Sequence, residues 1–94
     1  MDIKHIEGEK KSKILLYALS TCGWCRKTKT ILNELGIEYY YIDVDLLSPD
    51  EKDKVTEEVK KYNPACTFPT IVINDGERSI RGFKEDEIRQ LADR

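Results

Sequence analysis

The feature that most constrains the fold is an uninterrupted apolar run that leads directly into a helical pattern. Residues 14–19 (Ile-Leu-Leu-Tyr-Ala-Leu) lack the polar alternation of a strand with one face in water. Such a run is typical of a central strand covered on both sides, as parallel sheets with helical crossovers require. Apolar or small side chains then recur at three- and four-residue spacing until Gly36, at Thr28, Ile31, Leu32 and Leu35. A strand followed by an amphipathic helix indicates an α/β fold.

The remaining chain adds a second strand and helix, then a hairpin and a last helix. Residues 37–44 contain three consecutive tyrosines and favour a strand. The helix expected at 48–63 starts with a capping box and a proline, and it ends in lysines. Residues 70–73 and 78–80 flank an Asn-Asp-Gly-Glu turn and predict a hairpin. With a helix at 84–92, the order is β-α-β-α-β-β-α, and the first crossover should be right-handed.

The first thirteen residues leave two alternatives open. Residues 3–7, followed by a turn at Gly8, are compatible with an extra edge strand or with a frayed tail. A chain of 94 residues cannot divide into two units with separate cores. We therefore expect one domain, residues 14–94, built on a four-stranded mixed sheet with or without the N-terminal strand.

Charge and hydropathy exclude several classes of partner. The net charge is -2, and no block of like charges provides the basic surface that nucleic acids or anionic membranes require. The longest apolar run has six residues, against about 20 for a membrane span, and the N-terminus lacks the apolar region of a signal peptide. We expect a cytoplasmic protein that binds neither nucleic acid nor membrane.

Two of the three cysteines form a C-x-x-C motif where the first strand ends and the first helix begins. There, Cys22 should meet unpaired backbone N–H groups and the positive end of the helix dipole, which favour the thiolate. Cys25, one turn further on, should be shielded by its own helix and close enough to form a disulfide. We predict that Cys22 is the nucleophile and that Cys25 is the resolving thiol.

Basic residues follow the motif, although a helix start normally favours acids. Arg26, Lys27 and Lys29 oppose the helix dipole by roughly 0.3 to 1 kcal/mol each when exposed. A departure from the usual charge preference of a helix start is expected where the residues serve function rather than stability. Here these cations should further favour the Cys22 thiolate. The alternative is an ordinary solvated basic face.

Metal binding is a weaker interpretation of the cysteine pair. Closed zinc sites take four ligands, and the other candidates here, Cys66 and His5, are far apart in the chain. We predict no metal and regard His5 as a surface residue. Trp24, between the cysteines, is either a plain exposed aromatic or a lip that packs on the substrate. Cys66 is either a small, partly buried side chain or a thiol open to regulatory oxidation.

The segment Tyr17-Ala-Leu-Ser-Thr-Cys22-Gly-Trp-Cys25, with Thr67-Phe68-Pro69 and Gly82 downstream, resembles the glutaredoxins of the thioredoxin superfamily. The resemblance covers the chain from about residue 14 to the C-terminus. It implies a thioredoxin-like fold and a cis peptide bond before Pro69, which faces the cysteines. The backbone of Phe68, next to Thr67, would then pair with an extended substrate.

The resemblance implies a thiol-disulfide oxidoreductase that holds no bound cofactor. Such a protein, here expected to be a monomer, reduces protein disulfides or mixed disulfides and is recharged by a small thiol. One alternative is an iron-sulfur cluster carrier that uses the first cysteine. Others are a redoxin recharged by a flavin-dependent reductase and a noncatalytic adaptor.

This sequence departs from the family pattern at the glutathione pocket. Leu19 stands where glutaredoxins usually have a lysine, and Arg81-Gly82-Phe83-Lys84 replaces their Gly-Gly pair and following aspartate. Arg81 and Lys84 would repel the amino group of glutathione and favour an anionic head such as a carboxylate or sulfonate. The donor is therefore glutathione or another small thiol, of which coenzyme M is one candidate.

Overall fold

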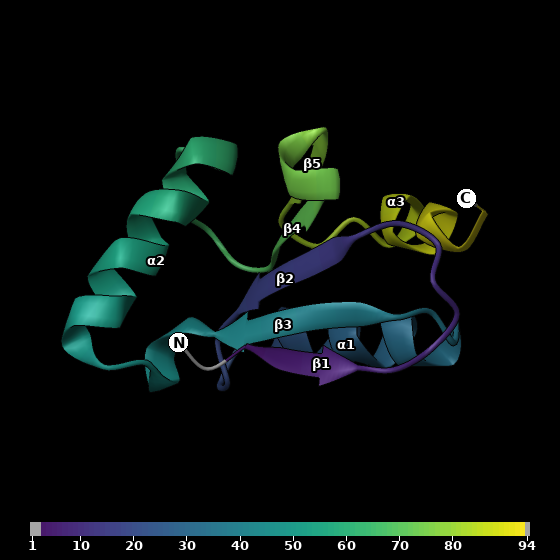
Figure 1. The fold of residues 1–94 in the computed structure, drawn as a ribbon, viewed down its shortest axis with the longest axis horizontal. Coiled ribbons are helices and arrows are strands. Elements are labelled where there is room, and N and C mark those ends of the chain that lie inside the picture. The colour runs from purple at the N-terminus through teal and green to yellow at the C-terminus, as the bar shows by residue number, and fades with distance from the viewer. Residues whose placement is uncertain (1–2, 94) are drawn as a thin grey trace.

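The structure is a computed structural model that describes residues 3–93, shown as a ribbon in Figure 1. The strands are β1 (Lys4–Ile6), β2 (Ile14–Ala18), β3 (Tyr39–Asp43), β4 (Thr70–Ile73) and β5 (Arg78–Arg81). The helices are α1 (Gly23–Glu34), α2 (Pro49–Tyr62) and α3 (Glu85–Arg89), with 3-10 turns η1 (Val44–Leu46), η2 (Asn74–Gly76) and η3 (Gln90–Asp93). From β2 onward, the order is the predicted β-α-β-α-β-β-α.

The strands form one mixed sheet in the order β1-β3-β2-β4-β5. β2 and β3 are parallel, with Tyr17 opposite Ile42. The other pairs, β1 with β3, β2 with β4 and β4 with β5, are antiparallel. β2 thus lies at the centre and is mostly buried, as its continuous apolar pattern predicts.

The N-terminal segment is an edge strand, which resolves the choice between a strand and a frayed tail. β1 runs antiparallel to β3 along the outer edge of the sheet. Beyond Gly8, the backbone N–H of Glu9 donates to the Gly36 carbonyl at 2.8 Å, and the N–H of Glu38 donates to the Glu9 carbonyl at 2.9 Å. A Cβ atom at Gly8 would lie 2.6 Å from the Gly36 oxygen. Glycine therefore permits this close approach of two backbones.

Helices cover both faces of the sheet (Figure 1). On one face, Leu32 of α1 and Ile88 of α3 pack with inward-facing residues of β2, β4 and β5. On the other face, Val55 and Val59 of α2 pack against Tyr17. Neighbouring residues of β2 serve two different cores because side chains alternate along a strand. Within residues 3–93, no helix has the length and apolar content needed to span a bilayer.

Element ends differ by a few residues from the sequence-based expectation. The strand expected at 37–44 is the shorter β3, because the chain turns into η1 directly after it. The helix expected at 84–92 divides into α3 and η3. The hairpin turn is a 3-10 turn in which Asn74 and Asp75 have φ of 51° and 58°, a left-handed conformation that these residue types tolerate.

A candidate dithiol active site

Cys22 lies where the loop after β2 enters α1. It is the N-cap residue, and its Sγ accepts a hydrogen bond from the backbone N–H of Cys25 at 3.2 Å. Serine, threonine, aspartate or asparagine usually fills this position, with a side-chain oxygen that accepts the same bond. The sulfur is thus placed at the positive end of the helix dipole, which stabilises negative charge. The first turn of α1 contains no acidic residue.

Cys25 has the opposite environment. Its side chain is fully buried in the core beneath α1, whereas Cys22 is half-buried. Burial above all, and then its hydrogen bond to Cys22, raises the pKa of the Cys25 thiol to about 12. Cys25 is therefore a neutral thiol near pH 7. This contrast supports the prediction that Cys22 attacks and that Cys25 resolves.

A carboxylate from another element fixes the loop that carries Cys22. Asp45, in η1, accepts hydrogen bonds from the backbone N–H of Ser20 at 2.8 Å and from its hydroxyl at 2.5 Å. These bonds lower the pKa of the Asp45 carboxyl below its usual range. The N–H of Cys22 in turn donates to the Leu19 carbonyl at 3.1 Å. Sequence reasoning missed Asp45 because it is 25 residues away from Ser20 and no local pattern marks it.

The Thr-Phe-Pro segment leads into β4 beside the cysteines. The peptide bond between Phe68 and Pro69 is cis, as the resemblance implies. The Pro69 carbonyl accepts a hydrogen bond from the N–H of Gly82 at 2.8 Å, which joins this segment to the loop before α3. Phe68, Phe83 and Cys22 all pack against the same core cluster. Tyr17 of β2 lies opposite Thr70 of β4, so the loop after β2 and the Thr-Phe-Pro segment lie at the same end of the sheet.

Asn63 holds the Thr-Phe-Pro segment, although the sequence marked it only as a helix end. Its side chain is buried. The Nδ2 group donates to the Thr67 carbonyl at 3.2 Å, the Thr67 hydroxyl at 2.9 Å and the Thr70 hydroxyl at 3.0 Å. The Thr70 hydroxyl donates to the Thr67 carbonyl at 2.6 Å. This network, in which Asn63 and Thr70 are buried, ties the end of α2 to the Thr-Phe-Pro segment.

Trp24 lies on the surface with 57% of its area exposed. Its ring stacks on Phe83 with centroids 4.9 Å apart. The Lys27 Nζ lies over both rings, 5.6 Å from each centroid, within the range of a cation–π interaction. That Trp24 packs on a substrate stays a prediction.

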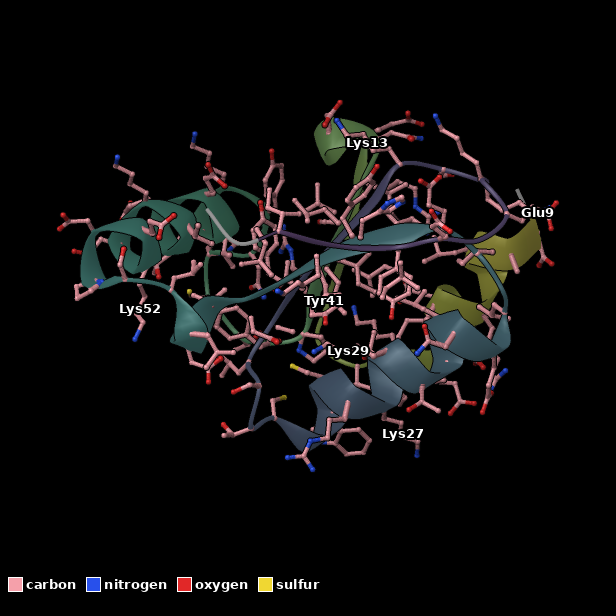
Figure 2. The ribbon with its side chains drawn as sticks, turned by 60° about the horizontal axis from the view of Figure 1, so that its bottom comes forward. Glu9, Lys13, Lys27, Lys29, Tyr41 and Lys52 are labelled. Atoms are coloured by element: carbon pink, nitrogen blue, oxygen red, sulfur yellow. The ribbon has the colours of Figure 1, made fainter. Side chains whose placement is uncertain are left out.

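Three of the other predicted cations have partners within the protein, whereas Arg26 lies exposed in the first turn of α1. Lys29 is turned toward the sheet, where its Nζ pairs with Asp43 at 3.0 Å and lies over the Tyr41 ring (Figure 2). Arg81 donates through Nε to the Tyr62 carbonyl at 2.8 Å, at the end of α2. Lys84 lies 3.8 Å from a Glu87 carboxylate oxygen. Sequence reasoning missed these partners because they depend on which face each side chain takes.

The remaining candidates lie outside the dithiol motif. Cys66 is half-buried, has a φ of 51° and packs against the core beneath α2. His5 lies on β1, where its Nε2 is 2.6 Å from a Glu38 carboxylate oxygen and its ring stacks on Tyr40. Among residues 3–93, no group of three or more histidine, cysteine or acidic side chains is arranged to hold a metal ion.

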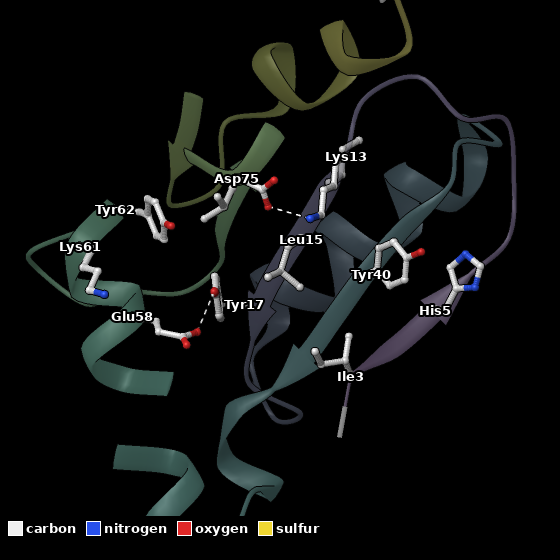
Figure 3. A pocket seen from close by; sticks show the side chains of 12 residues that line it. Ile3, His5, Lys13, Leu15, Tyr17, Tyr40, Glu58, Lys61, Tyr62 and Asp75 are labelled. Carbon is white, nitrogen blue, oxygen red and sulfur yellow. Dashed lines mark hydrogen bonds and ion pairs between the residues drawn. The ribbon is translucent and has the colours of Figure 1, made fainter. Parts of the chain in front are cut away.

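A cavity of about 640 Å³ lies between α2 and the N-terminal half of the sheet (Figure 3). Three of its twelve lining residues are tyrosines, and two interactions join lining residues: the Tyr17 hydroxyl donates to Glu58 at 3.3 Å, and Lys13 pairs with Asp75 at 2.8 Å. None of the predicted site residues lines this cavity. The dithiol site and this cavity are therefore separate features.

A strand-to-helix dithiol beside a cis-proline segment, on a sheet covered by helices on both faces, defines a thioredoxin-like dithiol protein. The glutaredoxin family model matches residues 14–78. Two solved structures superpose with a TM-score of 0.86 at 46% identity. One is a glutaredoxin from Methanosarcina mazei Go1, with 96% of this chain and 86% of that one covered. The other is Methanosarcina acetivorans methanoredoxin, with coverage of 90% and 88%.

A curated relative, glutaredoxin 1 of Rickettsia prowazekii, is 34% identical over 62 residues. The match covers 66% of this chain and 62% of the relative, so the chain spans about three fifths of that protein. The chain belongs to the glutaredoxin family. The resemblance read from the cysteine motif and the Thr-x-Pro segment is confirmed.

Proposed function

We propose that this protein is a thiol-disulfide oxidoreductase that reduces protein disulfides or mixed disulfides through Cys22 and Cys25. The observation that carries the proposal is the contrast between the two sulfurs. Cys22 is accessible and replaces the oxygen of a helix cap, whereas Cys25 is buried with its pKa raised to about 12. Cys25 is therefore held as a neutral thiol near pH 7, while Cys22 lies at a helix start, where the dipole favours negative charge.

The order of the reaction steps follows from this difference between Cys22 and Cys25. The Cys22 thiolate attacks one sulfur of a substrate disulfide, forms a mixed disulfide and releases the other substrate sulfur as a thiolate, which takes up a proton. Cys22 then carries no negative charge. The Coulombic repulsion from Cys22, one of the causes that raise the pKa of Cys25, is then absent. Cys25 can lose its proton, attack the Cys22 sulfur and release the second substrate thiol, which leaves a Cys22–Cys25 disulfide.

The Thr-Phe-Pro segment is suited to bind an extended substrate chain beside Phe68 and Pro69. Asn63 fixes the backbone of this segment through Thr67 and Thr70, and a rigid backbone lowers the cost of ordering a partner. Pairing of main-chain groups would allow many disulfide-containing proteins to bind with little sequence selection. We propose that the protein acts as a monomer in a reducing compartment such as the cytoplasm.

A small thiol would return the disulfide to the dithiol, either glutathione or another such as coenzyme M. The departure at Leu19 supports a donor other than glutathione. So does the similarity to a methanoredoxin, a redoxin named separately from the glutaredoxins. Assays with each small thiol, and with a flavin-dependent reductase, test the choice. Efficient turnover with glutathione alone would contradict a different donor.

Reduction of insulin disulfides with dithiothreitol as the electron source tests the activity itself. Wild-type protein should accelerate the reaction, and Cys22→Ser should not. Cys25→Ser should still attack and should accumulate a mixed disulfide that intact-mass spectrometry detects. If Cys22→Ser retained activity, or if Cys25→Ser lost the first attack, the assigned roles would be wrong.

A further inference from the structure

A cation lies beneath the resolving cysteine, between α1 and the sheet. Lys29 follows Cys25 by four residues on α1, and residues at this spacing are neighbours on one face of a helix. Cys25 is fully buried on that face. Figure 2 shows Lys29 turned toward the sheet, whereas Lys27 lies on the outer side of the helix. Lys29 and Cys25 are therefore neighbours on the inner face of α1.

An aspartate of the sheet holds Lys29 in this place. Asp43, the last residue of β3, accepts a hydrogen bond from the Lys29 Nζ at 3.0 Å. Only 22% of the Lys29 side chain and 17% of the Asp43 side chain are exposed. The Nζ also lies 4.2 Å from the centre of the Tyr41 ring. Asp43 pairs with Ala18 at the end of β2, so the ion pair is fixed at the end of the sheet from which the loop to the dithiol leaves.

The charge of Lys29 acts on a thiol in otherwise apolar surroundings. The elements packed against α1 contribute apolar side chains and phenols, which are neutral near pH 7, to this core: Leu16, Ala18, Tyr39, Tyr41 and Ile88. Burial above all, with a contribution from Cys22, raises the pKa of the Cys25 thiol to about 12, whereas the Lys29 ammonium acts in the opposite direction. Once Cys22 is part of a mixed disulfide, its negative charge is gone and that of Lys29 remains.

We propose that the Lys29–Asp43 pair sets the rate of the second step, in which Cys25 resolves the mixed disulfide on Cys22. The inference rests on the proposed function. Lys29 is a positioning residue that acts through Cys25, because its charge stabilises the Cys25 thiolate. Asp43 holds that charge beneath the helix and attenuates it. Cys22 lies seven residues from Lys29, about 10 Å along the helix axis, so the first attack depends on Lys29 far less.

The pair acts in both directions of exchange, because negative charge passes through the Cys25 sulfur in each. In resolution, Cys25 loses its proton and attacks the Cys22 sulfur, and the substrate sulfur leaves as a thiolate that takes up a proton. The protein dithiol is oxidised, and the substrate disulfide is reduced to two thiols. In recharging, a small thiolate attacks the Cys22 sulfur, and Cys25 leaves as a thiolate before it is protonated. A second small thiolate then releases Cys22, which yields one small disulfide and the protein dithiol.

Dithiobis(nitrobenzoic acid) separates the two steps, because each step releases one coloured thionitrobenzoate. Attack by Cys22 releases the first and binds the second in a mixed disulfide, from which Cys25 then displaces it. With the protein in excess, the rate of the first phase depends on protein concentration, whereas that of the second, intramolecular phase does not. A Cys66→Ser background removes the third thiol. Cys25→Ser, which should release only the first thionitrobenzoate, identifies the second phase.

Lys29→Gln and Asp43→Asn should change the second phase in opposite directions. Lys29→Gln should slow it about two- to fivefold at pH 7, because a higher pKa of Cys25 leaves less thiolate, an effect that greater nucleophilicity offsets in part. Asp43→Asn leaves the Lys29 charge uncompensated and should accelerate the second phase by a similar factor. The curve of log rate against pH should shift to higher pH in Lys29→Gln and to lower pH in Asp43→Asn. The first phase should change by less than about twofold in both.

Two further variants serve as controls. Lys29→Arg keeps the charge and should retain the wild-type rate of the second phase. Lys54→Gln removes the same charge at an exposed site on α2 and should change neither phase. Thermal unfolding of each variant measures the stability that the ion pair contributes. A purely structural role predicts slower resolution in both Lys29→Gln and Asp43→Asn, in parallel with their loss of stability.

Slower resolution in both variants, or an unchanged second phase in Lys29→Gln, would overturn the assignment of the pair. If Lys29→Gln does not fold, Asp43→Asn decides alone, because acceleration supports the assignment and slowing contradicts it. These outcomes leave the proposed function intact as long as the wild-type protein shows both phases. A wild-type protein that lacks the second phase would instead reject Cys25 as the resolving thiol, and with it the proposed function.

Discussion

Helices α1 and α2 begin in opposite ways. α2 has Ser48 at its N-cap, proline in its first turn and two acids beside it, and its last turn holds Lys60 and Lys61. The Ser48 hydroxyl also donates to the Glu51 carboxylate at 3.1 Å. Each of these choices stabilises a helix. α1 has a cysteine at the cap, glycine at its first position, no acid in its first turn and no cation in its last.

The difference is what the proposed function predicts, because the start of α2 suits helix stability whereas the start of α1 suits a reactive sulfur. A cap sulfur is a weak hydrogen-bond acceptor, and a glycine at a helix start adds flexibility that folding must remove. An acid in the first turn of α1 would stabilise the helix but repel a thiolate. The sequence at α1 is therefore poor for a helix and well suited to a reactive sulfur.

The largest expected effect comes from Cys22→Ser. Serine is a better cap than cysteine, so the free energy of unfolding should stay the same or rise. Disulfide exchange should nevertheless be abolished, because the hydroxyl is not ionised near pH 7. Thermal unfolding and the insulin assay on one preparation would show the separation. A variant that loses stability in parallel with activity would contradict the idea that α1 gives up stability for function.

Asn63→Ala should have the next largest effect, because it removes the donor to the buried Thr70 hydroxyl and two of the hydrogen bonds that hold Thr67. The expected loss is about 1 to 3 kcal/mol of unfolding free energy in urea denaturation. Disulfide exchange should slow as well, because the segment before Pro69 loses its support. Asn33→Ala removes the 3.0 Å hydrogen bond from the Tyr39 hydroxyl at the far end of α1. It serves as a control that should leave exchange unchanged.

Gly23→Glu would give α1 the kind of start that α2 has. A Cβ atom at Gly23 meets nothing within 4 Å, so the side chain fits without a clash. The change should raise the unfolding free energy by about 1 kcal/mol through the helix dipole and reduced chain entropy. Alkylation of Cys22 should slow about two- to fivefold, because the new carboxylate disfavours the thiolate. Gly23→Ala, the uncharged control, should gain stability without slowing the reaction.

Ser48→Ala should have the smallest effect and should act on stability alone. Removal of the cap at α2 should cost about 1 kcal/mol of unfolding free energy. The rate of disulfide exchange should be unchanged, because this helix start belongs to no part of the proposed site. A large loss of activity would show that the two helix starts are coupled, which would weaken the comparison.

Local patterns predicted the elements of the fold and the positions of the two cysteines. The apolar run of β2 and the capping box of α2 are each contained in a few consecutive residues. The residues that support the site are not marked by any such local pattern. Asp45 reaches Ser20 across 25 residues, and Asn63 acts through a network that exists only once α2 packs on the sheet.

Arg81 shows why cations near a motif are difficult to assign from sequence. Ile80 is buried with the α1 and α3 core, so Arg81, its neighbour on β5, points toward α2. The alternation along β5 contained this information, but only after the face of the sheet had been identified. Lys27, in contrast, lies near Trp24 simply because three residues make almost one helical turn.

The most direct test of the central claim is the rate of alkylation of Cys22 and Cys25 as a function of pH. Reduced protein would be treated briefly with iodoacetamide and digested, and each peptide would be measured by mass spectrometry. Cys22 should react first at pH 7, faster than in unfolded protein, while Cys25 stays unmodified until the pH approaches its raised pKa of about 12. Faster modification of Cys25, or no rate advantage for Cys22 over the unfolded chain, would contradict the account.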